Sequence, residues 1–212
     1  MHGYNECVRA MQIKEEHRET IVIQKSRFIA CVKPCHSEEE ARAYIDAIRN
    51  EFSDASHVCT AFVVGPNNEI QRSNDNKEPS GTAGVPMLES IKNANIQNVC
   101  ACVVRYFGGI KLGAGGLIRA YAGAVTSALQ NATKVIKKPV SYWKVVFPYE
   151  EAGTIEQWIR KHYELKEIQY EETITCYFEC EEKEPVLEKI GSLSKGSITP
   201  EFIETHYVDV IV

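Results

Sequence analysis

The stretch RYFGGIKLGAGGLIRAY, Arg105–Tyr121, joins a run typical of a β-strand to a run typical of a helix. Before it, NVCACVV is almost entirely apolar, as in a strand buried on both faces. Towards its end, Leu117, Ala120, Tyr121 and Ala124 begin an apolar stripe with helical spacing. We therefore predict a strand, a loop and a helix that begins near Gly116 or Leu117. Five glycines lie at this junction: Gly108, Gly109, Gly113, Gly115 and Gly116.

Glycines in this number allow positive φ values, so that backbone N–H groups can converge on an anion at the start of a helix. Arg119 falls in the first turn, where the helix dipole disfavours a cation by a few tenths of a kcal/mol unless an anion lies nearby. Lys111 and Arg105 flank the same loop. The stretch thus predicts a site for phosphate, either of a nucleotide or of an RNA backbone.

Known glycine motifs do not account for this spacing. No GK[ST] follows, as a P-loop needs, and Gly113, Gly115 and Gly116 do not form GxGxxG. GxxG does occur, but it is a common string and here it lies between a strand and a helix. The alternative is tight packing, with Arg119 paired to Asp75 or Glu78. The glycine density exceeds what one tight turn requires, which favours the phosphate site.

A second loop, SNDNKEPSGTAGVP (residues 73–86), fits neither helical nor strand periodicity. Its hydroxyls and glycines could assist phosphate binding, while Asp75 and Glu78 could hold a magnesium ion. His57 starts a strand near these loops, and a histidine bonded to the backbone is the simpler interpretation of it. The chain contains neither HExxH nor GxSxG, so we expect a binding protein rather than a hydrolase.

The composition is that of a globular protein, with 212 residues, 44% hydrophobic and 25% charged. Its apolar runs are far shorter than the roughly 20 residues of a membrane span. The start, MHGYNECVRA, has no apolar signal region, so we expect a cytoplasmic protein without membrane contact. The eight cysteines are then expected to be free thiols, with Cys100, Cys102, Cys176 and Cys180 buried in strands.

Charge divides the chain into two predicted domains, residues 1–138 and 139–212. The first carries 17 basic and 14 acidic residues, and the second 7 and 15, which makes their net charges +3 and −8. The break falls at KVIKKP, where a helical pattern ends. An acidic surface repels nucleic acid, so the second domain is expected to meet a protein partner.

In the first domain, residues 19–34 predict one long strand bent near 25–27. Ser37 with Glu40 forms a capping box before a helix, residues 56–65 and 69–73 predict paired strands, and a helix opens at Pro86. Together with Arg105–Tyr121 these elements give an α/β sandwich. The second domain has the order βαββαβ, the ferredoxin-like arrangement, so the fold class is α+β.

Four strings carry a family resemblance: KSRFIA (residues 25–30), ASH (55–57), EPSGTAG (78–84) and the long glycine stretch. In this order they resemble the IMPACT/YigZ family. The resemblance implies a first domain similar to the second domain of ribosomal protein S5. The implied second domain is ferredoxin-like and similar to the last domain of elongation factor G. One departure is clear, because the family usually has two aspartates and a glycine before EP, whereas this chain has Asp75, Asn76 and Lys77.

The resemblance also carries expectations about function. Eukaryotic members regulate translation by competing for the activator of a stress-responsive kinase of an initiation factor. They do so through a region that includes an N-terminal domain not found in this sequence. The likeness to S5 and elongation factor G implies contact with RNA or the ribosome. The S5-like fold also occurs in small-molecule kinases, which keeps an enzyme as an alternative.

We therefore predict a translation-regulatory protein that binds RNA or a ribosomal component and needs no cofactor. The alternative is a magnesium-dependent enzyme acting on a nucleotide or phosphorylated metabolite, with Asp75 and Glu78 as metal ligands. A third possibility is a protein-interaction module that works through the acidic second domain. The predicted phosphate or RNA contacts are Lys25, Arg27, Ser80, Gly81, Thr82, Gly84, Arg105, Gly108, Gly109, Lys111, Gly113, Gly115, Gly116 and Arg119.

Overall fold

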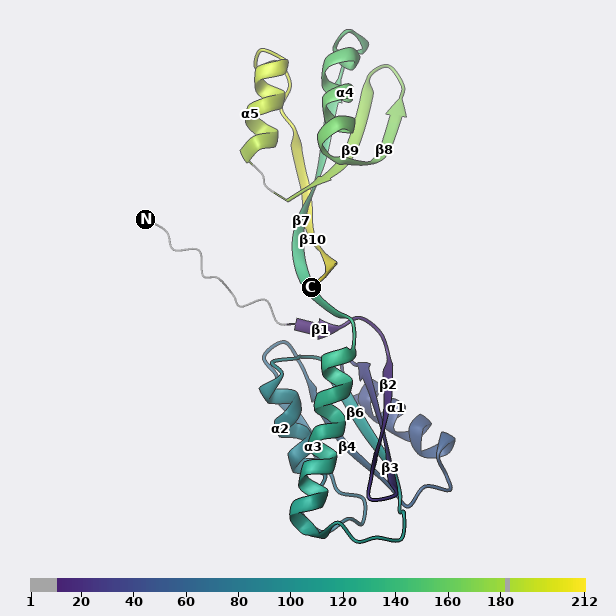
Figure 1. The fold of residues 1–212 in the computed structure, drawn as a ribbon. Helices are drawn as coiled ribbons and strands as arrows, with labels where there is room; N and C mark the ends of the chain where they lie inside the picture. The colour runs from purple at the N-terminus through teal and green to yellow at the C-terminus, as the bar shows by residue number, and fades with distance from the viewer. Residues whose placement is uncertain (1–10, 182–183) are drawn as a thin grey trace, which may run out of the picture. The chain divides into compact units, whose positions relative to one another are not determined.

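A computed structural model describes residues 11–181 and 184–212 of the chain (Figure 1). It has two compact units: the first runs to Ile136 and includes Ile211–Val212, and the second is Lys137–Val210. Each combines helices with an antiparallel sheet, so the predicted α+β class is confirmed. Among the helices in the described part of the chain, none combines the length and apolar character that crossing a membrane requires.

The first unit is built on a five-stranded sheet with the order β2-β3-β6-β4-β5, in which every neighbouring pair is antiparallel. Of the three inner strands, β4 and β6 are buried along almost their whole length, as their apolar sequences predict. The strands are β2 (His17–Ile23), β3 (Ser26–Pro34), β4 (His57–Val64), β5 (Ile70–Asn74) and β6 (Val99–Tyr106).

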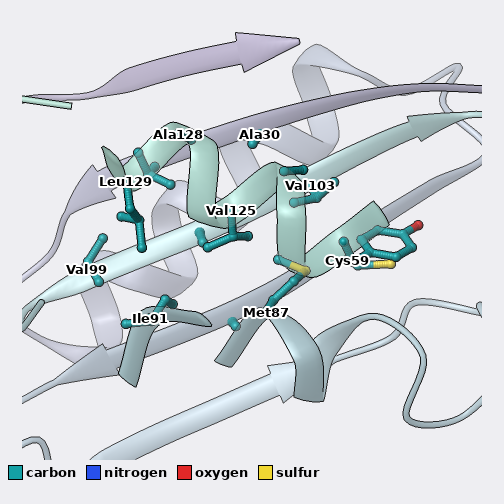
Figure 2. Close-up of a cluster of buried hydrophobic side chains, with 14 of the residues drawn as sticks. Ala30, Cys59, Met87, Ile91, Val99, Val103, Val125, Ala128 and Leu129 are labelled. Carbon is teal, nitrogen blue, oxygen red and sulfur yellow. The ribbon is translucent and has the colours of Figure 1, made fainter. Parts of the chain in front are cut away.

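Helices cover both faces of this sheet. One face packs against α2 (Gly84–Asn93) and α3 (Gly113–Asn131), and Figure 2 shows the side chains that meet there, among them Met87, Val103 and Leu129. The other face packs against α1 (Glu38–Glu51), whose cap is Ser37 as predicted. All seven cysteines in the described residues are free and buried, which confirms that prediction for Cys100, Cys102, Cys176 and Cys180.

The predicted long strand over residues 19–34 is wrong, because β2 and β3 form a hairpin. Ile23 pairs with Ser26, so Gln24 and Lys25 make a two-residue turn. Both have positive φ values, 44° and 65°. Such turns usually carry Asn-Gly or Asp-Gly, and Gln-Lys gives no such signal in the sequence.

Two helices begin earlier than their sequences predict. Helix α3 starts at Gly113, three residues before Gly116, so three of the five glycines belong to its first turn. Helix α2 starts at Gly84, which places Pro86 two residues inside its first turn. Both helices start in a segment that contains glycines and lacks apolar periodicity, so the sequence pattern does not indicate the first helical residue.

The second unit has the predicted order βαββαβ and the sheet order β10-β7-β9-β8 of a ferredoxin-like fold. Trp143, Phe178 and Ile155 are among the residues of its core, which lies between the sheet and its two helices. Strand β7 begins in the first unit, where Lys134–Ile136 pair with the short strand β1 (Met11–Ile13). The remaining elements are β7 (Lys134–Phe147), a 3-10 turn (Tyr149–Glu151), α4 (Ala152–His162), β8 (Glu164–Tyr170), β9 (Ile174–Cys180), α5 (Glu184–Leu193) and β10 (Glu201–Ile211).

Candidate phosphate-binding site

Three loops of the first unit meet where β6 ends. Arg105 lies opposite Phe28 of β3 and His57 of β4 in the sheet register. The β2–β3 turn, the β5–α2 loop (residues 75–83) and the β6–α3 loop (residues 107–112) therefore gather at one end of the sheet. The structure thus brings together the loops that contain the predicted phosphate-binding residues.

A buried ion pair lies beneath these loops. The Nη1 atom of Arg105 donates to Oε1 of Glu78 at 2.6 Å, and the Tyr121 hydroxyl donates to the same oxygen at 2.7 Å. Only 6% of the Arg105 side chain and 3% of the Glu78 side chain is exposed. Burial, together with the neighbouring Cys59 and Glu78, raises the pKa of the Tyr121 hydroxyl, which keeps it a neutral donor.

The predicted role of Arg105 as a phosphate contact is not supported, since its guanidinium faces the interior. Besides Glu78 it reaches Ser26 Oγ at 3.5 Å and lies 5.4 Å from the centre of the Phe28 ring. Its buried Nε has no hydrogen-bond partner among the described residues. Arg105 stabilises the end of the sheet because it neutralises the charge of Glu78, whose buried carboxylate is not solvated by water.

The β5–α2 loop is held by Asp75. Its Oδ2 accepts the N–H of Gly81 at 2.8 Å, and its Oδ1 accepts those of Ala83 and Gly84 at 3.0 and 2.8 Å. Asp75 therefore caps the start of α2 from eight and nine residues upstream. Both carboxylates of the magnesium alternative, Asp75 and Glu78, are thus engaged with donors from the protein itself.

Two other predicted contacts of this loop are also occupied. Thr82 is buried, and its hydroxyl donates to the carbonyl of Pro79 at 2.7 Å. Gly84 is buried against the backbone of Asn74, which a Cβ atom would approach within 2.7 Å. Neither residue is available to a ligand, while Ser80 is exposed and Gly81 is half-buried.

Replacement of Asp75 by Asn should lower the free energy of unfolding by about 1 kcal/mol at neutral pH, as loss of a helix cap does. Burial alone would raise the pKa of the Asp75 carboxyl, but its three backbone donors outweigh burial and hold the pKa below the ordinary 3.8. This stabilisation is therefore complete above pH 3.8 and is lost as the pH falls through the lower folded pKa. Urea unfolding at neutral and acidic pH tests this, because the two proteins should converge in acid; a pH-independent difference would contradict it.

His57 has the backbone-bonded role that was the simpler expectation. Its Nδ1 lies 2.9 Å from the carbonyl oxygen of Asn76, which fixes Nδ1–H as the donor and leaves Nε2 towards Glu78 at 3.9 Å. Asn76 and Lys77 both have positive φ values, so His57 helps hold a strained turn. The histidine thus connects β4 to the β5–α2 loop.

Gly108 fastens the β6–α3 loop to the β2–β3 turn. Its N–H donates to Ser26 Oγ at 3.2 Å, and a Cβ atom at this position would lie 2.0 Å from the carbonyl carbon of Lys25. The preceding N–H, of Phe107, donates to Ser56 Oγ at 3.1 Å. Gly108 is therefore required for packing, and its N–H points to Ser26 rather than to a ligand.

The following backbone amides, residues 109–115, have no such partners. The N–H groups of residues 109–112 have no hydrogen-bond acceptor within the described residues. Helix α3 then begins without a side-chain cap and without an acidic residue in its first turn, so the N–H groups of residues 113–115 are also free. Gly109, Gly113 and Gly115 are exposed, and nothing lies within 4 Å of the Cβ position of the first two. This segment can donate several hydrogen bonds to an anion.

Five exposed cations lie in the same three loops or at their borders: Lys25, Arg27, Lys77, Lys111 and Arg119. We call them the basic end. In the described part of the chain none of them forms an ion pair with a carboxylate, and Arg27 instead stacks over the Tyr106 ring at 4.4 Å. Arg119 therefore does not pair with Asp75 or Glu78, as tight packing alone would have required.

Sequence reasoning missed three residues of this end. Lys77 stood out in the sequence only as a departure from the pattern of the family that the chain resembles, and it was not among the predicted contacts. Phe107 and Ile110 are 48% and 42% exposed on the β6–α3 loop. Exposed aromatic side chains beside unpaired cations are typical of surfaces that bind single-stranded nucleic acid.

The fold and this end together define a class: a two-unit α+β protein that presents uncapped backbone amides and unpaired cations on a loop anchored by a buried ion pair. Comparison with known proteins identifies one family. The model of the Impact N-terminal domain matches residues 24–129, and the chain belongs to the IMPACT family.

The relatives cover most of the chain. The IMPACT family member YvyE of Bacillus subtilis is 45% identical over 81% of this chain and 80% of its own length. A Thermus thermophilus member is 38% identical over 84% of this chain and 98% of its own. A solved structure described as a hypothetical protein is 30% identical, with a TM-score of 0.59 over 92% of this chain and 97% of its own. The two-unit fold is therefore shared with a protein of known structure.

Proposed function

We propose that this protein acts in the cytoplasm as a regulator of translation and that its basic end binds the phosphate backbone of RNA, free or within a ribosomal component. The run of unpartnered N–H groups at residues 109–115 is the observation that carries this proposal. Such groups at a helix start are donors for phosphate oxygens. The regulatory part rests on family membership and on the expectations that follow from it.

Charge favours phosphate at this end even though the whole chain carries −5. The five cations of the basic end are unpaired among the described residues, whereas the carboxylate of Glu78 is already neutralised by Arg105. A negative chain with one basic end binds RNA locally, and such binding weakens with salt as counterions are released. Phe107 adds an exposed ring on which an unpaired base can stack.

The double variant Lys111→Ala with Arg119→Ala should bind a labelled RNA hairpin more weakly than the wild type. Each phosphate contact removed is expected to make the slope of log K against log salt shallower by about 1. Fluorescence anisotropy at several salt concentrations measures both quantities. The expected result is a weaker affinity and a slope that is shallower by about 2.

A matched control removes two positive charges from the second unit instead of from the basic end. Lys161 and Lys195 are exposed in the second unit and lack a carboxylate partner among the described residues, so Lys161→Ala with Lys195→Ala should bind RNA like the wild type. Equal RNA affinity of the Lys111/Arg119 variant and the wild type at every salt concentration would refute the proposal. A parallel titration with ATP and magnesium tests the enzyme alternative, for which Asp75 and Glu78 would first have to leave their present donors.

A further inference from the structure

The sheet of the second unit has one face that its helices leave open. Along β7, Trp143, Val145 and Phe147 are buried in the core with α4 and α5. The residues that alternate with these point to the other face and are partly or fully exposed: Tyr142, Lys144 and Val146 of β7, and Thr175, Tyr177 and Glu179 of β9. They include Val146, which is 42% exposed. The face is therefore solvent-accessible at the two central strands.

Two tyrosines lie at the centre of this face. Tyr142 of β7 and Tyr177 of β9 are stacked, with ring centres 6.0 Å apart and planes 19° apart. His206 of β10 contacts Tyr142 edge-on, with ring centres 6.3 Å apart. The face thus offers an aromatic surface that spans adjacent strands.

Carboxylates flank the tyrosine pair on both sides. Glu167 of β8 lies opposite Tyr177 in the register, and Glu204 lies on β10. Glu179 lies opposite Tyr142 in the register, and Glu204 lies two residues before His206 on β10 and therefore points to the same face. Burial raises the pKa of the Tyr142 hydroxyl, and the negative charges of Glu167, Glu179 and Glu204 raise it further. The three carboxylates and the two rings form what we call the tyrosine face.

Two of these carboxylates lack a cation. Glu179 is paired with Lys166 at 3.1 Å and with His206 at 3.0 Å. Glu167 and Glu204 form no ion pair within residues 11–181 and 184–212. The nearby Lys144 and Lys166 are each paired, with Glu201 at 3.5 Å and Glu164 at 2.8 Å. The uncompensated charge on this face is therefore negative.

We propose that the tyrosine face docks an arginine-containing basic segment of another protein. The face of a tyrosine ring attracts a guanidinium, and an unpaired carboxylate accepts its N–H groups. The same carboxylates disfavour phosphate, so RNA is the less suitable occupant. The net charge of −8 over residues 139–212 favours the approach of a basic segment. This surface is separate from the basic end, and the proposal does not depend on RNA binding there.

The test uses the full chain and a fluorescein-labelled arginine-glycine peptide, with the citrulline-glycine peptide as its uncharged counterpart. Two double variants, Tyr142→Leu with Tyr177→Leu and Glu167→Gln with Glu204→Gln, should each weaken binding of the arginine peptide about tenfold. Removal of two carboxylates in the β8–β9 turn, Glu171→Gln with Glu172→Gln, should leave it within about twofold, because these exposed residues lie outside the tyrosine face. Thermal unfolding confirms that each variant is folded.

Each other outcome overturns the proposal. Wild-type affinity in both tyrosine-face variants would show that the peptide binds elsewhere, and an equal loss in the Glu171/Glu172 control would reduce the effect to general acidity. Binding of the citrulline peptide as tightly as the arginine peptide would exclude recognition of a cation. If the tyrosine variant lost RNA binding or self-association instead, the occupant would be a stacked base or a second copy of the chain. Peptide binding should also persist in the Lys111/Arg119 variant, and its loss there would contradict a docking surface that is independent of the basic end.

Discussion

The Gly108→Ala variant should be less stable than the wild type by about 3 kcal/mol in the free energy of unfolding, which is the range of a severe overpacking change. A Cβ atom at residue 108 would lie 2.0 Å from the carbonyl carbon of Lys25, 2.1 Å from its oxygen and 2.4 Å from the nitrogen of Ser26. All three are backbone atoms, so no side-chain rotation can make room. The β2–β3 turn would have to move, and the hydrogen bond from Gly108 N–H to Ser26 would be lost with it.

A second glycine supplies the control for this measurement. Gly123 is exposed within α3, and nothing lies within 4 Å of its Cβ position. Alanine there should raise stability by about 0.5–1 kcal/mol, because it favours the helix more than glycine does. Urea unfolding of both variants measures the contrast. A Gly108→Ala protein as stable as the Gly123→Ala protein would mean that the two loops do not approach so closely in solution.

The helices and buried strands could be predicted because their apolar periodicity is strong, as Leu117, Ala120 and Tyr121 show for α3. The start of α3 could not, since Leu112 at its N-cap makes no side-chain hydrogen bond and the first turn is mostly glycine. The β2–β3 hairpin was missed for a similar reason. Gln24 and Lys25 adopt positive φ values because strand pairing and the contact with Gly108 hold them there.

The candidate site was predicted in its location but not in the roles of its residues. The sequence predicted the same role, a phosphate contact, for Arg105, Lys111 and Arg119, because all three are cations beside a glycine-rich loop. Folding separates them, because Arg105 ends a buried strand and meets Glu78, whereas Lys111 and Arg119 stay exposed without acidic partners in the described structure. Whether a cation is paired depends on contacts between residues far apart in the chain, which no local pattern contains.

The buried ion pair explains how flexible glycines can be held in one place. Glu78 is in the β5–α2 loop, Arg105 ends β6, and Tyr121 is in α3. One carboxylate oxygen thus connects the three elements that surround the basic end. Gly108 and Ser26 add the fourth connection, to the β2–β3 turn. The exposed amides of residues 109–115 are therefore presented by a fixed frame, which lowers the entropy cost of binding an anion.

Replacement of Glu78 by Leu should destabilise the first unit by about 3–5 kcal/mol, since it leaves a buried guanidinium without its counter-charge. The only side-chain hydrogen bond that Arg105 would retain is the one to Ser26 Oγ at 3.5 Å, and its Nε already lacks a partner among the described residues. The Tyr121 hydroxyl would lose its acceptor as well. Chemical unfolding followed by circular dichroism measures the loss.

The double variant Glu78→Leu with Arg105→Met separates a missing charge from a missing side chain. It removes both charges and fills similar volume with apolar groups, so it should recover most of the stability lost in Glu78→Leu. Strictly additive losses would show that the two side chains are not coupled and would remove the ion pair as the frame of the basic end. If the double variant is stable yet binds the RNA hairpin less tightly than the wild type, the ion pair positions the loop for binding beyond its part in folding. Unchanged RNA binding would assign that positioning to Gly108 and the β2–β3 turn.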